Sequence, residues 1–73
     1  MKASDFAQIL RQIRERRQLT QEDLARELDV TVGTLSNWEN ARHRPVRAQR
    51  RRIEQIAESL GLLESSVLQR KAP

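Results

Sequence analysis

The residues best suited to chemistry with a partner lie between positions 31 and 52. Residues 42–52 hold six arginines and no acid, whereas residues 20–41 hold five acids and one base. Guanidinium groups bind phosphate oxygens, and the amide of Asn37 can form two hydrogen bonds with an adenine edge. The pattern favours a surface that grips phosphates beside a helix face that meets bases. A solvated charged surface is the plainer interpretation of any basic run.

Other kinds of site find no support in the sequence. His43 is the one histidine, there is no cysteine, and no cluster of acids surrounds that histidine, so we expect no metal site and no cofactor. No carboxylate pair, nucleophile–base pair or phosphate-binding loop stands out. We therefore expect that the chain is not an enzyme, and we interpret His43 as a polar loop residue that also suits phosphate.

Length and composition limit the fold class. The 73 residues, with a net charge of +4, predict one small domain over residues 1–73. Two glycines and two prolines predict an all-α chain with short joints, a compact bundle of four or five helices. No apolar run reaches the roughly 18–20 residues of a membrane span, and the first residues lack the apolar core of a signal peptide. Together with the absence of cysteine, these features predict a cytoplasmic protein.

Two short helical patterns, separated by three residues, follow one another in the middle of the chain. Thr20 and Thr31 each precede one pattern as a candidate N-cap, and Asp23 stands at the third helical position of the first. We predict two helices here, over 21–28 and 32–40. Their join is too short for antiparallel packing, so the helices should cross steeply, and Ala25 would let them approach closely.

The spacing within these helices matches a known motif. Counting Gln21 as the first position, Ala25, Asp29 and Leu35 fill the slots for a small residue, a turn residue and a core residue. The segment resembles the helix-turn-helix of the Cro/phage-repressor family, also called the xenobiotic-response-element family. The resemblance covers about residues 6–68 and implies a lambda-repressor-like DNA-binding domain whose second motif helix enters the major groove. Asp29 replaces the family's usual glycine, and aspartate tolerates the left-handed backbone required there.

The resemblance also implies which residues contact DNA. The family's main base-reading slots map to Val32, Gly33 and Asn37 on the uncharged outward face of helix 32–40, and Thr34 and Ser36 of the same helix are further base-reading candidates. The phosphate candidates are Gln21, Thr31, Asn40, Arg42, His43, Arg44 and Arg47. Gln21 fills the family slot whose side chain hydrogen-bonds a phosphate. Gly33 is a poor helix residue, which fits either close approach to DNA or plain tolerance in a first turn.

The other helices are predicted over 5–17, 46–60 and 64–70. Ser4 is the expected cap of the first, and Gly61 the residue that ends the second. The expected inner stripe of helix 46–60 consists of Val46, Gln49, Ile53, Ile56, Ala57 and Leu60. After Asn40 the family usually has glycine, and Ala41 stands there instead. Either Asn40 takes the left-handed turn or the helix runs on slightly.

Two features of the predicted core concern the end of helix 32–40. Trp38 follows Leu35 by three residues, so both should face inward. In relatives, an arginine of the first helix pairs with a buried glutamate at this end, which implies an Arg14–Glu39 ion pair. A cationic partner for Glu39 is also expected because a carboxylate near a helix C-terminus opposes the helix dipole.

The C-terminal stretch is dense in apolar residues, namely Leu62, Leu63, Val67 and Leu68. They either cap the core or form a dimer surface, and relatives dimerise through this region. The resemblance thus implies a transcriptional repressor that binds double-stranded DNA as a homodimer at a two-fold symmetric operator. Two alternatives stay open: an antitoxin that neutralises a protein toxin and represses its own operon, and a protein-interaction module. The charge-free face of helix 32–40 argues against the module.

Overall fold

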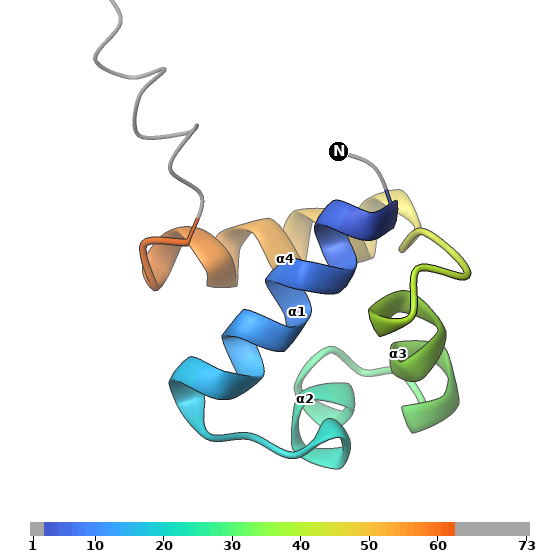
Figure 1. Ribbon diagram of the computed structural model, residues 1–73, viewed down its shortest axis with the longest axis horizontal. Coiled ribbons are helices and arrows are strands. Elements are labelled where there is room, and N and C mark those ends of the chain that lie inside the picture. Colours follow the sequence, from blue (N-terminus) through green and yellow to red (C-terminus); the bar gives the residue numbers. More distant parts are fainter. Residues whose placement is uncertain (1–2, 63–73) are drawn as a thin grey trace, which may run out of the picture.

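The computed structural model describes residues 3–62, which form four α-helices joined by short loops (Figure 1). They are α1 (Ala3–Arg17), α2 (Gln21–Glu27), α3 (Val32–Glu39) and α4 (Arg47–Ser59). No strand occurs among these residues, so the predicted all-α fold is confirmed. The predicted helix over 64–70 lies outside the described residues.

The start of α1 differs from the prediction. Ser4 was expected to cap a helix that begins at residue 5, but α1 already begins at Ala3. Ser4 is therefore inside the helix and does not have the extended backbone that an N-cap residue adopts. Asp5 still lies in the first turn, where its charge complements the helix dipole.

The starts of α2 and α3 agree with the predicted caps. The hydroxyl of Thr20 accepts from the N–H of Asp23 at 3.0 Å, and the Asp23 carboxylate accepts from the N–H of Thr20 at 3.0 Å. The hydroxyl of Thr31 accepts from the N–H of Thr34 at 3.1 Å. Each threonine satisfies a backbone donor that the helix itself leaves unpaired, and so fixes where the helix begins.

All four helices end with a left-handed residue just beyond the last turn: Gln18 (φ 55°), Asp29 (61°), Ala41 (59°) and Gly61 (73°). After α3, the N–H of Ala41 donates to the carbonyl of Trp38 and the N–H of Arg42 to that of Asn37. These two bonds make a Schellman ending, which requires the left-handed residue directly after the cap. Tolerance of that conformation by Asp29 is confirmed. The prediction for α3 is wrong, because Ala41 and not Asn40 (φ −99°) turns left-handed.

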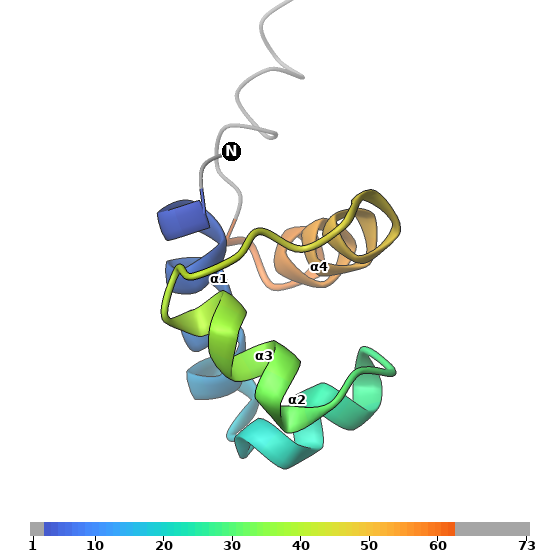
Figure 2. The same cartoon turned by 90° about the vertical axis from the view of Figure 1, so that its right-hand side faces the viewer.

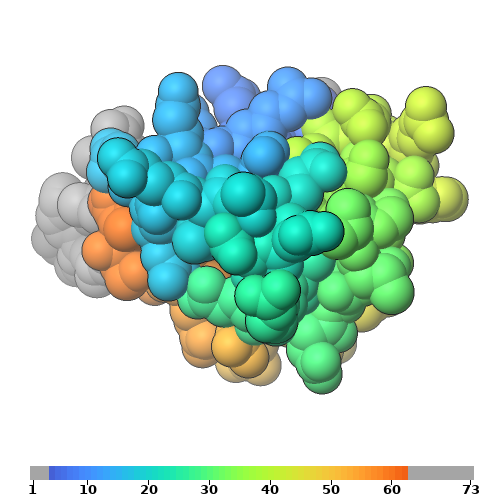
Figure 3. Space-filling model, turned by 90° about the horizontal axis from the view of Figure 1, so that it is seen from below, coloured from blue at the N-terminus to red at the C-terminus, as the bar shows by residue number. Residues whose placement is uncertain are grey.

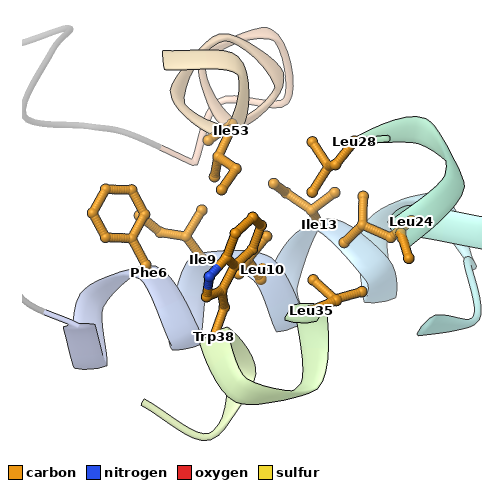
Figure 4. Packing of buried hydrophobic residues seen from close by; sticks show 11 residues of the cluster. Phe6, Ile9, Leu10, Ile13, Leu24, Leu28, Leu35, Trp38 and Ile53 are labelled. Carbon is orange, nitrogen blue, oxygen red and sulfur yellow. The ribbon is translucent and has the colours of Figure 1, made fainter. Parts of the chain in front are cut away.

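The hydrophobic core is a single cluster to which all four helices contribute (Figure 4). Leu10 and Ile13 of α1, Leu24 of α2, Leu35 of α3 and Ile53 of α4 are fully buried. Trp38 points from α3 into this cluster and is 5% exposed, so its predicted place in the core is confirmed. Ala25 of α2 is buried, and α2 packs against α3, in agreement with the predicted close approach of the two helices.

The start of α4 corrects a second expectation. Val46 was placed on the inner stripe of a helix over 46–60, but α4 begins at Arg47 and Val46 is its extended N-cap residue. Because Val46 lies outside the helix, the helical periodicity does not apply to it, and its side chain is 65% exposed. Pro45 is buried instead. Ile53 and Ala57 occupy the inner side of α4 as predicted.

Candidate nucleic-acid interface

One face of the molecule displays α3 together with the loop over residues 40–46 (Figure 2). In this view α3 lies across the front, α2 lies below it, and the loop passes above it into α4. The helix that carries the base-reading candidates and the loop that carries Arg42, His43 and Arg44 therefore lie on the same face. The short helix α3 thus begins at the Thr31 cap and leads directly into the basic loop over residues 40–46.

Asn37 is the polar side chain of α3 that is left available for a partner. Thr31 and Thr34 are joined through their hydroxyls at 2.9 Å, and the amide of Asn40 donates to the carbonyl and hydroxyl of Ser36. Asn37 is half-buried, and its side chain has no hydrogen bond with any residue of 3–62. The side-chain amide of Asn37 therefore remains free of internal hydrogen bonds and can bind a partner.

The glycine of α3 has no structural role within the described chain. A Cβ atom built on Gly33 would meet only the Thr31 hydroxyl oxygen, at an ordinary 3.9 Å, and the backbone there is helical. Val32 beside it is 38% exposed. Internal crowding therefore does not explain a glycine at this position, and its two predicted explanations, tolerance and close approach to DNA, both remain.

The arginines fall into two groups that the sequence alone does not separate. Seven of them bind a carboxylate or a backbone carbonyl of the chain: Arg11, Arg14, Arg16, Arg17, Arg26, Arg50 and Arg52. Four others are exposed and have no bonded partner within residues 3–62: Arg42, Arg44, Arg47 and Arg51. All four belong to the loop after α3 or to the first turns of α4. The uncommitted positive charge of residues 3–62 thus lies in the loop that follows α3 and in the first turns of α4.

The predicted ion pair at the end of α3 is present. Arg14 Nη1 lies 3.1 Å from Glu39 Oε1, and the Glu39 side chain is 4% exposed. Gln21, which was predicted to bind a phosphate, donates from Nε2 to the same Oε1 at 3.0 Å. Arg11 donates to the backbone carbonyl of Glu39 at 2.8 Å. The first residue of α2 is therefore tied to the last residue of α3 and, through it, to α1.

A family model for helix-turn-helix domains matches residues 5–68, most of the chain. The chain belongs to this helix-turn-helix family. The match agrees with the resemblance to Cro-type repressors and with the all-α fold. None of the curated proteins or solved structures that were compared matches the chain significantly.

Most acidic residues of the two motif helices belong to α2 and the turn that follows it. Figure 3 shows α2 in the middle of the lower surface with α3 beside it. A shallow hollow between them is lined by Glu22, Arg26, Asp29 and Val32, among others. Glu27 pairs with Arg17 at 2.7 Å, and hydrogen bonds from Thr20 lower the pKa of Asp23. Within residues 20–46, the acids that reach the surface therefore lie on α2 and in the turn after it, whereas Glu39 of α3 is buried.

The predicted dimer residues are described only at their start. Leu62 is half-buried and packs against the core of the domain, while Leu63, Val67 and Leu68 lie outside the described residues. No helix of the described part is long and apolar enough to cross a membrane. None of the described residues forms a group of His, Asp or Glu suited to a metal ion.

Sequence reasoning missed two features of this interface. Arg51 follows Arg47 by one helical turn, and that spacing was a usable signal for a second exposed arginine on the same side of α4. The bond between Gln21 and Glu39 joins residues 18 positions apart, and its only sequence signal was the need of Glu39 for donors.

Proposed function

We propose that this helix-turn-helix domain is a sequence-specific DNA-binding transcriptional regulator that acts as a repressor. The observation that carries the proposal is that four exposed arginines without an internal partner follow α3, in the loop and at the start of α4, while the amide of Asn37 on α3 also has no partner within residues 3–62. An exposed guanidinium without an internal partner can neutralise a phosphate without breaking an existing bond. This combination suits a double-stranded DNA partner.

The proposed reading unit is the outward face of α3. Asn37 would pair with a base edge in the major groove, Val32 would contact a thymine methyl group, and Gly33 would let the backbone approach the DNA closely. Thr34 and Ser36 complete the proposed face. Because two of its residues have no hydrogen-bonding side chain, direct readout would depend heavily on Asn37.

The proposed phosphate contacts come from segments that precede and follow α3 in the chain. Arg42, Arg44 and Arg47 extend from the loop and from the start of α4, and Gln21 lies at the start of α2. Thr31, Asn40 and His43 add neutral contacts at the two ends of α3 and in the loop. Such contacts fix the position of the helix in the groove without reading sequence.

We further propose that the domain, residues 1–73, acts as a homodimer on a two-fold symmetric operator. One helix reads only a few base pairs, too few for selective binding in a genome, whereas two copies double the site. The apolar residues Leu63, Val67 and Leu68 remain the proposed seam, next to the half-buried Leu62. A dimer seated on a promoter would repress by excluding other proteins.

Selection of bound duplexes from a pool of random DNA tests this proposal. We expect enrichment of one two-fold symmetric sequence whose half-sites are centred about one helical turn, roughly 34 Å, apart. Sedimentation of the protein with the enriched duplex should give two chains per duplex. Failure to enrich any sequence would contradict specific binding, and one chain per duplex would contradict the dimer.

A further inference from the structure

Glu39 is the one charged residue that is buried among residues 3–62. The DNA interface proposed above gives its carboxylate no part in binding. Two donors reach its Oε1 atom, Arg14 Nη1 at 3.1 Å and Gln21 Nε2 at 3.0 Å. Its Oε2 atom is buried and receives no donor from the described residues. Arg14 already supplies the opposite charge, so neutralisation alone does not require Gln21.

The chemistry of the pair fixes the orientation of the Gln21 amide. An ionised carboxylate only accepts hydrogen bonds, so Gln21 must turn its nitrogen, and not its oxygen, toward Glu39. That nitrogen carries a second hydrogen, for which the described residues provide no acceptor. The Gln21 side chain is half-buried and so remains reachable from solvent.

We propose that Glu39 is a positioning residue for DNA binding: it holds the Gln21 amide so that the second N–H of Nε2 donates to a DNA phosphate. The inference rests on the proposed function and adds to it the group that orients the contact. A side chain held in its binding rotamer before association loses less freedom on binding. The Gln21–Glu39 hydrogen bond also links the proposed phosphate contact at the start of α2 to the end of α3, the proposed reading helix.

The proposal predicts an effect of Glu39→Gln on DNA affinity that is opposite to the effect expected from charge alone. Removing a negative charge from a DNA-binding protein ordinarily strengthens binding to phosphates. The Glu39→Gln variant removes such a charge, but its side-chain amide presents both a donor and an acceptor, so Gln21 is free to turn its oxygen outward. We therefore expect Glu39→Gln to bind operator DNA more weakly than the parent.

The test measures dissociation constants for the duplex that the parent protein selects from random DNA. The proteins are the parent, Gln21→Ala, Glu39→Gln and the double variant, each below its unfolding transition. We expect both single variants to lose roughly tenfold in affinity, the value of one hydrogen bond to a charged group. The double variant should bind no more weakly than Gln21→Ala, because both changes remove the same contact.

Glu27→Gln is the matched control. Glu27 is also a carboxylate paired with an arginine of α1, at 2.7 Å from Arg17, but it has no bond with Gln21. It should bind DNA as tightly as the parent or slightly more tightly. In the free protein, the side-chain amide signals of Gln21 in a ¹H–¹⁵N spectrum should move toward ordinary glutamine values in Glu39→Gln and stay unchanged in Glu27→Gln.

Three results would overturn the inference. Glu39→Gln could bind as tightly as the parent, or could cost as much in the Gln21→Ala background as in the parent. Gln21→Ala could also leave affinity unchanged, which removes the contact that Glu39 is meant to position. None of these would remove the proposed DNA-binding function, which the loop arginines test separately through the salt dependence of binding.

Discussion

Gly33 and Asn37 lie one turn apart on the same face of α3, so the uncommitted amide of Asn37 stands next to a position without a side chain. Nothing in the described chain requires that gap, since a Cβ at Gly33 would have an ordinary contact with Thr31. The gap is therefore best understood through what the face binds. A base-pair edge could approach the backbone at Gly33 while Asn37 pairs with it.

Gly33→Ala should separate stability from DNA binding. We expect the free energy of unfolding to rise by about 0.5–1 kcal/mol, because alanine favours the helix. Operator affinity should fall by about 1–3 kcal/mol, since the added methyl group keeps the base edge away from Asn37. Thermal melting and titration with the selected duplex measure the two effects.

Gly61→Ala is the control for that glycine. Gly61 has φ 73°, so alanine there should cost stability, about 1–2 kcal/mol, without touching the DNA face. Its operator affinity should equal that of the parent below the unfolding transition. If Gly33→Ala keeps full operator affinity, the gap has no part in recognition and the glycine is merely tolerated.

The two groups of arginines should differ in the salt dependence of DNA binding. Arg44 has no partner within residues 3–62, so Arg44→Ala should weaken binding to all duplexes and reduce the log–log salt slope by about 1 for each phosphate that it no longer neutralises. Arg52 already donates to the carbonyl of Glu27 at 3.1 Å, so Arg52→Ala should leave the slope nearly unchanged. Equal slopes for the two variants would refute this division of the arginines.

Ala41 should be a residue at which glycine stabilises the fold. Its φ of 59° is unfavourable for alanine, so Ala41→Gly should raise the free energy of unfolding by up to about 1 kcal/mol. Ala48, exposed in the first turn of α4, provides the opposite case, because Ala48→Gly should lower it by about 0.5–1 kcal/mol. Chemical denaturation of both variants checks the pair, and a decrease in stability in Ala41→Gly would mean that the left-handed ending carries no strain.

Asp23 should make the stability of the capping box depend on pH. The backbone N–H of Thr20, the Thr20 side chain and the charge of Arg26 lower the pKa of Asp23 below its ordinary value of 3.8. A lowered native pKa stabilises the fold above the unfolded pKa, and this contribution disappears as the pH falls through the native value. The stability difference between the parent and Asp23→Asn should therefore be constant above about pH 5 and shrink below about pH 4. A difference that persists to the lowest pH at which both fold would contradict this.

What the sequence could predict here was mostly local. The capping bonds that mark the starts of α2 and α3 join residues three positions apart, Thr20 with Asp23 and Thr31 with Thr34. The spacing of Leu35 and Trp38 likewise identified the buried side of α3. Ser4 and Val46 were misplaced because each prediction depended on a helix boundary that was off by one or two residues.

The remaining features depend on contacts between distant parts of the chain. Arg50, Arg51 and Arg52 are the same residue three times in succession, yet the first donates to the carbonyl of Pro45, the third to that of Glu27, and the second to none of the described residues. The bond of Arg50 is local, five positions along the chain, but only the fold brings Arg52 to Glu27, 25 positions away. The bond between Gln21 and Glu39 likewise exists only because α2 and α3 cross as they do.

Comparison of Asn37→Ala with the parent on two duplexes tests the central claim most directly. One duplex carries the selected operator and the other a random sequence of the same length, at the same salt concentration. If α3 reads bases through Asn37, the variant should lose about 1–3 kcal/mol on the operator and almost nothing on the random duplex. Equal losses on both duplexes, or none on the operator, would contradict the assignment of this face as the sequence-reading surface.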